Sequence, residues 1–137
     1  MKACLSALLL LMSSPAMAAS SAGHGNGGPL VDLDAIVTRH NQSGELFRIE
    51  GHCQSACTLF LGIRNVCVDP AASLLFQAGH DWNKRISGPA TSHLMHAYNG
   101  RLRAYLMSNH YMETLDFHAI SGRDLIQKFG YRECPGI

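Results

Sequence analysis

Ser55 stands in the stretch GHCQSACTLFLG, where residue types and positions together favour acyl-transfer chemistry. Residues 45–50 alternate polar and apolar as in a strand, and residues 56–61 are apolar on every side, which favours a buried helix starting near Ser55. A serine at such a turn exposes its hydroxyl at the positive end of the helix dipole, where N–H groups can stabilise an oxyanion. The motif G-x-S-x-G fails, because Cys53 and Cys57 occupy its glycine positions. Taken alone, Ser55 fits a helix N-cap better than a nucleophile.

The cysteines form a second group of reactive side chains. Residues 1–18 have the features of a signal peptide, described below, and four cysteines follow them: Cys53, Cys57, Cys67 and Cys134. An even number of cysteines in an exported chain predicts disulfides, with three possible pairings. A zinc site would need a close pair such as C-x-x-C, which the sequence lacks. A thiol nucleophile beside His52 is a weaker interpretation, because exported thiols are usually paired.

Other chemistry finds less support in the sequence. His93 and His96 are spaced to share a metal on a helix, but they have no convincing third ligand, so surface positions are favoured. We therefore expect no metal site and no cofactor. Removal of the predicted signal peptide takes away Lys2, so 10 of the 11 Lys and Arg remain against 10 Asp and Glu and the net charge is zero. Nucleic acid is therefore a poor candidate partner.

Periodicity and turn residues predict the elements that must position these side chains. We expect helices at 32–41, from Ser55, over 91–112 with a break at Asn99-Gly100, and from Ser121 to Gly130, with strands at 45–50, 65–69 and 73–77. Residues 19–29 are expected to be a flexible lead or glycine loop. Residues 79–89 form a polar loop whose Trp82 either lines a cleft or closes the domain edge. This order predicts an α/β domain with helices packed on a small sheet.

The N-terminal residues have the features of a cleavable signal peptide. Lys2 is followed by an apolar run over 3–12, Pro15 and the small-x-small site Ala16-Met17-Ala18. The apolar run is too short to span a bilayer, which takes about 20 residues. We therefore expect a signal peptide at 1–18 and one domain at 19–137 that is periplasmic or secreted.

The order of these features resembles the Clp protease proteolytic subunit and its signal-peptide-peptidase relatives. The match runs from about Gly27-Gly28 through G-x-C-x-S-A-C and the strand with Asp69-Pro70 to ISGRDLIQKFGY, ending near Arg132. The chain looks closer still to small exported bacterial proteins with G-x-C-x-S-A-C-T, a Cys strand and F-H-A. The resemblance implies a truncated ClpP/crotonase-like single domain that has lost the family's first strand and helix.

The resemblance also implies roles for individual residues. Ser55 matches the nucleophile, and the N–H groups of Gly28 and Ala56 match the oxyanion donors. The family's general-base histidine falls on Gln77, and glutamine cannot take a proton from serine near neutral pH. His80 is the candidate replacement if its loop turns back.

The third catalytic member is open between Glu113 and Asp116. Three functions are consistent with these residues. The first is a small exported serine peptidase or esterase that uses Ser55 and a non-standard base. The second is a degenerate, non-catalytic domain that binds a peptide or an envelope protein, which Gln77 and the truncated start favour. The third is a homo-oligomer built through an uncovered edge strand.

Overall fold

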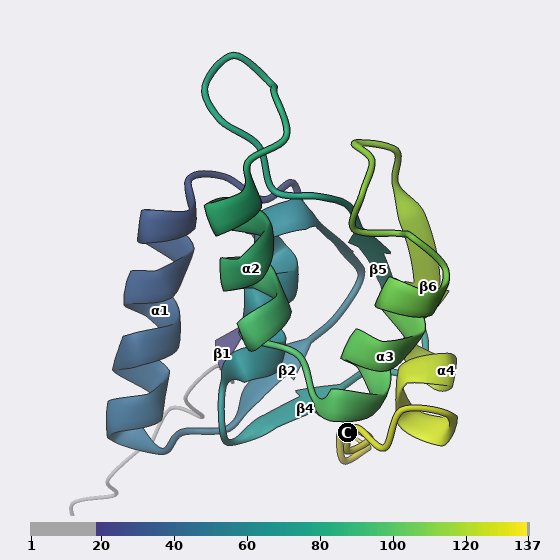
Figure 1. The fold of residues 1–137 in the computed structure, drawn as a ribbon. Coiled ribbons are helices and arrows are strands. Elements are labelled where there is room, and N and C mark those ends of the chain that lie inside the picture. The colour runs from purple at the N-terminus through teal and green to yellow at the C-terminus, as the bar shows by residue number, and fades with distance from the viewer. Residues whose placement is uncertain (1–18, 137) are drawn as a thin grey trace, which may run out of the picture.

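Two three-stranded sheets organise the computed structural model, which describes residues 19–136 (Figure 1). The first sheet has the order β1-β2-β4 and is parallel throughout; its strands are β1 (Ala19–Ser20), β2 (Phe47–Ile49) and β4 (Val66–Val68). The second has the order β3-β5-β6, with β3 (His52–Gln54) parallel to β5 (Ser73–Phe76) and β6 (His118–Ser121) antiparallel to it. The predicted signal peptide, 1–18, lies outside the described residues.

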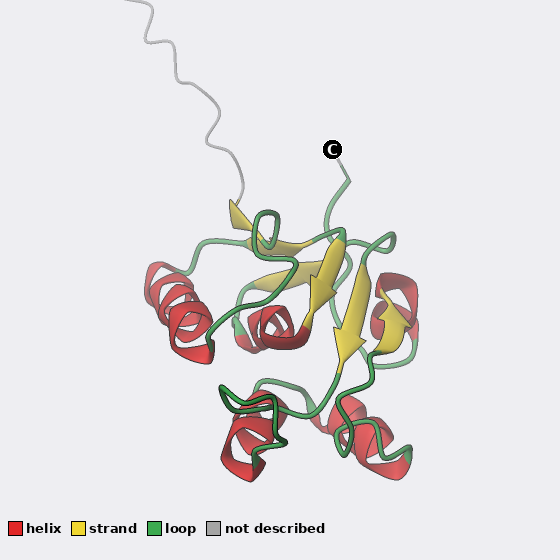
Figure 2. Cartoon of the chain, turned by 90° about the horizontal axis from the view of Figure 1, so that it is seen from above, coloured by secondary structure: helices red, strands yellow, loops and turns green. Residues whose placement is uncertain are grey.

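Five helices complete the described part of the chain. They are α1 (Leu30–Ser43), the 3-10 helix η1 (Ser55–Gly62), α2 (Gly88–His96), α3 (Gly100–Ser108) and α4 (Gly122–Gln127). Figure 2 shows the strands in the upper part of the domain, with helices to their left, to their right and below them. The mixed α/β character predicted from sequence is confirmed. No helix within residues 19–136 is long and apolar enough to cross a membrane.

The 3-10 helix η1 is the centre of the core. It contacts α1, α2 and strands of both sheets, and every residue from Ala56 to Leu61 is buried. Its Phe60 ring packs 4.7 Å from the ring of Phe47 on β2. A helix surrounded on all sides has no polar face. This explains why the sequence here shows an apolar run rather than an amphipathic period.

Three strands escape prediction from the sequence. The composition of residues 19–29 predicts a flexible lead, yet Ala19–Ser20 pairs with β2. Ser21 is fully buried and holds the backbone of Glu50, whose N–H donates to its Oγ at 2.9 Å. Strands β3 and β6 are also unexpected, because neither has the run of β-branched or aromatic residues that marks a strand. Their pairing with β5 across distant sequence defines them.

The predicted break in the helix over 91–112 is confirmed. Asn99 separates α2 from α3, and its Oδ1 accepts a hydrogen bond from the N–H of Leu102 at 2.9 Å. Its Nδ2 donates to the carbonyl of Phe129, which ties the start of α3 to the C-terminal segment. The division therefore follows from a capping residue as well as from the glycine at position 100.

Candidate functional site

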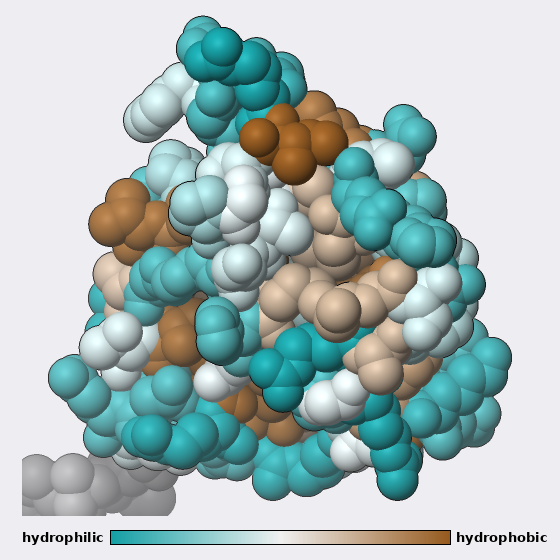
Figure 3. Space-filling view, in the orientation of Figure 1, coloured by the Kyte–Doolittle hydropathy of each residue, from teal (hydrophilic) through white to brown (hydrophobic). Residues whose placement is uncertain are grey.

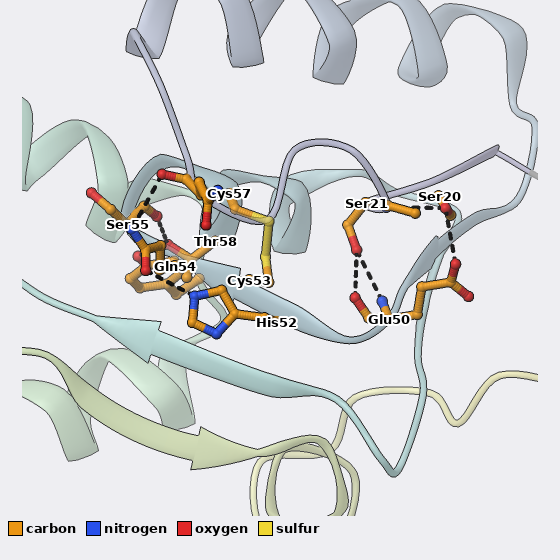
Figure 4. The surroundings of a disulfide bond; sticks show 12 residues. Ser20, Ser21, Glu50, His52, Cys53, Gln54, Ser55, Cys57 and Thr58 are labelled. Atoms are coloured by element: carbon orange, nitrogen blue, oxygen red, sulfur yellow. Dashed lines mark hydrogen bonds between the residues drawn. A yellow bond between two sulfur atoms is a disulfide. The ribbon is translucent and has the colours of Figure 1, made fainter.

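Ser55 lies where β3 ends and η1 begins, and its backbone is left-handed. Its φ is +52°, whereas Gln54 before it is extended. The disulfide between Cys53 and Cys57 closes this turn, with the two Cα atoms 5.2 Å apart (Figure 4). Because L-residues other than glycine pay about 1–2 kcal/mol for a left-handed backbone, the turn is held by its surroundings. Cys53 and Cys57, which replace the two glycines of G-x-S-x-G, thus lie on either side of Ser55 and are joined by a disulfide bond.

The buried hydroxyls of Thr58 and Tyr98 also stabilise this turn. Thr58 Oγ1 donates to the carbonyl of Ser55 at 2.6 Å, and the Tyr98 hydroxyl lies 2.6 Å from Thr58 Oγ1. Since Thr58 uses its proton on Ser55, Tyr98 is the donor in the second bond. Burial raises the pKa of Tyr98, so its hydroxyl keeps the proton that this chain of bonds requires.

Gln77 is the side chain that the fold brings to Ser55. It follows β5, is 6% exposed, and its Nε2 donates to Ser55 Oγ at 2.9 Å. This is the position that the resemblance assigns to the general base. An amide nitrogen donates a hydrogen bond and has no lone pair to accept a proton. Within residues 19–136, Ser55 Oγ has no other hydrogen-bond partner in the protein.

The Gly27-Gly28 pair runs against the same turn. Both glycines have positive φ, +79° and +141°. A Cβ on Gly27 would lie 3.0 Å from the carbonyl oxygen of Gln54 and 3.4 Å from the nitrogen of Ala56, so only glycine allows this approach. Among the residues that the structure describes, the N–H of Gly28 has no protein acceptor. The N–H of Ala56 belongs to the first turn of η1, where helical N–H groups lack a partner within the helix.

A cavity of about 400 Å³ opens onto Ser55. We call it the Ser55 cavity; its lining consists of Gly28, Pro29, Leu30, Val31, Ser55, Ala56, Gly79, His80, Asp81, Trp82, Lys84 and Leu94. The lining is mostly apolar, and Ser55 contributes a hydroxyl group to it. Trp82 belongs to this lining, but it is 94% exposed, so its side chain lies almost wholly in solvent beside the cavity.

The loop between β5 and α2 forms one side of this cavity and projects from the surface (Figures 1 and 3). Asp81 organises it, because its carboxylate accepts from the backbone N–H groups of Asn83 and Arg85 and from Arg85 Nε. These bonds, led by that of the Arg85 N–H, lower the pKa of Asp81. His80 pairs with Ile86 across the base of the loop.

Among the described residues, none of the other predicted catalytic side chains hydrogen-bonds to Ser55. His80 lines the Ser55 cavity, but it is exposed and its Nδ1 lies 3.0 Å from the carbonyl of Asp81. Glu113 pairs with His110 at 3.0 Å and lines a second, more open cavity beside α2 and α3. Asp116 is exposed and belongs to neither lining. The geometry thus gathers Ser55, Gly28, Ala56 and His80 around one cavity, with Gln77 behind the serine.

The disulfide pairing, which the sequence left open, is Cys53 with Cys57 and Cys67 with Cys134. The two helical histidines do not act together: His93 pairs with Asp34 at 2.8 Å, whereas His96 faces the second cavity. Within residues 19–136, no group of three or more His, Cys, Asp or Glu side chains could hold a metal ion.

Comparison of the chain with protein-family models, curated proteins and solved structures gives no match.

Proposed function

We propose that this chain is an exported, ClpP-like domain that binds a peptide or envelope protein without cleaving it. The contact that carries this proposal is the 2.9 Å hydrogen bond from Gln77 Nε2 to Ser55 Oγ. Serine becomes a nucleophile when a neighbouring base takes its proton. Here the buried neighbour donates a hydrogen bond to the hydroxyl oxygen and offers no base, so the hydroxyl keeps its proton.

Export is part of the proposal. It is supported by the N-terminal sequence and by two disulfides, which form and persist mainly in oxidising compartments. The Ser55 cavity supports binding, because its volume falls in the range of ligand pockets and its apolar walls surround a few polar groups.

A second candidate function is a weak serine hydrolase. Three observations favour it: the left-handed backbone at Ser55, the N–H groups of Gly28 and Ala56 beside it, and His80 in the same cavity lining. For this function the loop that carries His80 must turn its ring toward Ser55.

Reaction with a fluorophosphonate separates the two functions. The folded mature protein is incubated with the reagent at pH 6 to 9, and intact mass and peptide mapping locate any adduct. The Ser55→Ala variant is the control for reaction elsewhere. We expect no Ser55 adduct in the unchanged protein. An adduct at Ser55 that disappears in His80→Ala would establish the hydrolase instead.

A further inference from the structure

We propose that the Ser55 cavity recognises a free carboxylate carried on an apolar group, such as the C-terminus of a peptide ending in an aliphatic residue. This inference rests on the proposed non-catalytic function and adds the chemical class of the ligand. It follows from the hydrogen-bond donors, the apolar side chains and the charged residues in the lining of the cavity.

The lining of the cavity includes hydrogen-bond donors. The Gln77 amide donates to Ser55 Oγ and so occupies a lone pair of the hydroxyl. The hydroxyl's own proton has no protein acceptor within residues 19–136 and remains free to donate. The N–H groups of Gly28 and Ala56 add two further donors without protein partners in the described chain. A ligand must therefore bring acceptors.

A carboxylate suits these donors better than an amide or ester carbonyl. It has two oxygens and about four acceptor positions, so it can satisfy several donors at once. Hydrogen bonds to an ionised acceptor are also roughly twice as strong as neutral ones. In a catalytic serine site the same donors would serve a transient oxyanion. With no base to deprotonate Ser55, they are left to serve a stable anion.

The charges around the cavity agree with an anionic ligand. Lys84 lines it and brings a positive charge. Asp81 is the one acidic residue in the lining, and its oxygens already accept from Arg85 and from backbone N–H groups. Its charge is thus offset by a direct partner, whereas Lys84 has no carboxylate partner among residues 19–136.

The walls fit an apolar group attached to that carboxylate. The lining includes five large or cyclic apolar side chains, those of Pro29, Leu30, Val31, Trp82 and Leu94. Val31 is 72% exposed and Trp82 is 94% exposed, so two large apolar side chains stand uncovered beside the cavity. Covering them with a ligand's aliphatic group would remove apolar surface from water.

The test compares an acid with its amide. N-acetyl-Ala-Ala-Leu with a free carboxylate, the same peptide as its C-terminal amide, and octanoate are titrated into the mature protein by calorimetry. Trp82 is the only tryptophan of the chain, so its emission gives a second readout that is specific to this cavity. We expect the acid to bind about ten- to a hundredfold more tightly than the amide, as charge-assisted hydrogen bonds predict, with a blue shift of Trp82 emission.

Octanoate identifies the source of the carboxylate. If it binds as tightly as the peptide acid, the site takes fatty acids; if only the peptide acid binds, the site takes peptide C-termini. Either result supports the inference. Equal binding of acid and amide, or no binding of any of the three, overturns it.

Two variants locate the binding. Ser55→Ala should weaken binding of the peptide acid about five- to tenfold. It should leave binding of the peptide amide unchanged, because the hydrogen bond from the hydroxyl is strong only to the ionised carboxylate. Ser108→Ala, at the exposed end of α3, is the matched control and should change neither. A Ser55→Ala variant that binds the acid as well as the unchanged protein contradicts the assignment. The fluorophosphonate result is read separately, so an active hydrolase and a wrong ligand class give different outcomes.

Discussion

At the scale of single residues, Ser55 combines a left-handed backbone with a hydroxyl that accepts a hydrogen bond from Gln77. The surrounding contacts hold it there: the Cys53–Cys57 disulfide across the turn and the bond from Thr58 to its carbonyl. Residues held in sparsely populated backbone regions cluster at functional sites. The conformation thus supports a functional site, while the proposed non-catalytic function rests on the contact between Gln77 and Ser55.

The strain at Ser55 predicts a difference between two variants that both remove the hydroxyl. Because glycine adopts φ near +52° without steric cost, Ser55→Gly should be more stable than Ser55→Ala by about 1 kcal/mol. Urea unfolding at neutral pH measures the difference. Equal stabilities, or a more stable alanine variant, would show that the turn stores no such strain.

The sequence identified Ser55, Gly28 and Ala56 as neighbours only through a resemblance, and the structure does place Ser55, Gly28 and Ala56 in one cavity lining. The contact between Gln77 and Ser55 could not be predicted from local sequence patterns, because the two residues lie 22 positions apart and the pairing of β3 with β5 brings them together. The loop geometry of His80 was equally out of reach, since it depends on the bonds that Asp81 makes.

At the scale of elements, α2 packs closely against the segment that follows β5, and both contribute residues to the lining of the Ser55 cavity. Gly79 lies against α2, and its N–H donates to Thr91 Oγ1 at 2.9 Å. A Cβ on Gly79 would lie 2.6 Å from the backbone carbon and from the Cβ of Ala90, closer than real contacts allow. The helix and the loop therefore need glycine at this crossing.

Gly79→Ala should therefore destabilise the protein by about 1–3 kcal/mol, as overpacking does elsewhere, and displace α2. Gly88→Ala is the matched control, because a Cβ at the start of α2 would meet nothing within 4 Å. Thermal unfolding compares the two. A Gly79→Ala variant as stable as Gly88→Ala would contradict the close approach.

The helices were the elements best predicted from sequence. Residues 32–41 lie within α1, and Asn99 divides α2 from α3 as expected. Helices carry their own signals in caps and a 3.6-residue period. The short strands β1, β3 and β6 carry almost none, because their bounds are set by partners far along the chain.

At the scale of the whole molecule, two disulfides act over different lengths of chain. The Cys67–Cys134 bond joins residues 67 positions apart and ties β4 to the C-terminal segment. The Cys53–Cys57 bond spans only 4 positions. The sequence allowed three pairings because cysteine spacing alone does not show which strands become neighbours.

Loop length predicts unequal effects on stability. Replacing both Cys67 and Cys134 by alanine should cost about 4 kcal/mol, and replacing both Cys53 and Cys57 about 2 kcal/mol, because the longer loop restricts the unfolded chain more. Guanidinium unfolding of the two double variants measures this difference. A larger loss for the Cys53–Cys57 variant would show that this short bond acts mainly on the folded turn at Ser55.

Gln77 is the hydrogen-bond partner of Ser55, the position that a general base would occupy in a serine hydrolase. The proposed function depends most on this contact. The direct measurement is the rate at which a fluorophosphonate modifies Ser55 in the unchanged protein and in Gln77→His, both shown to be folded. We predict no measurable modification of the unchanged protein and modification of Gln77→His at Ser55, because an imidazole accepts the proton that an amide cannot. Equal modification of both proteins at Ser55 would contradict the proposal, since the serine would then be activated without a base at position 77.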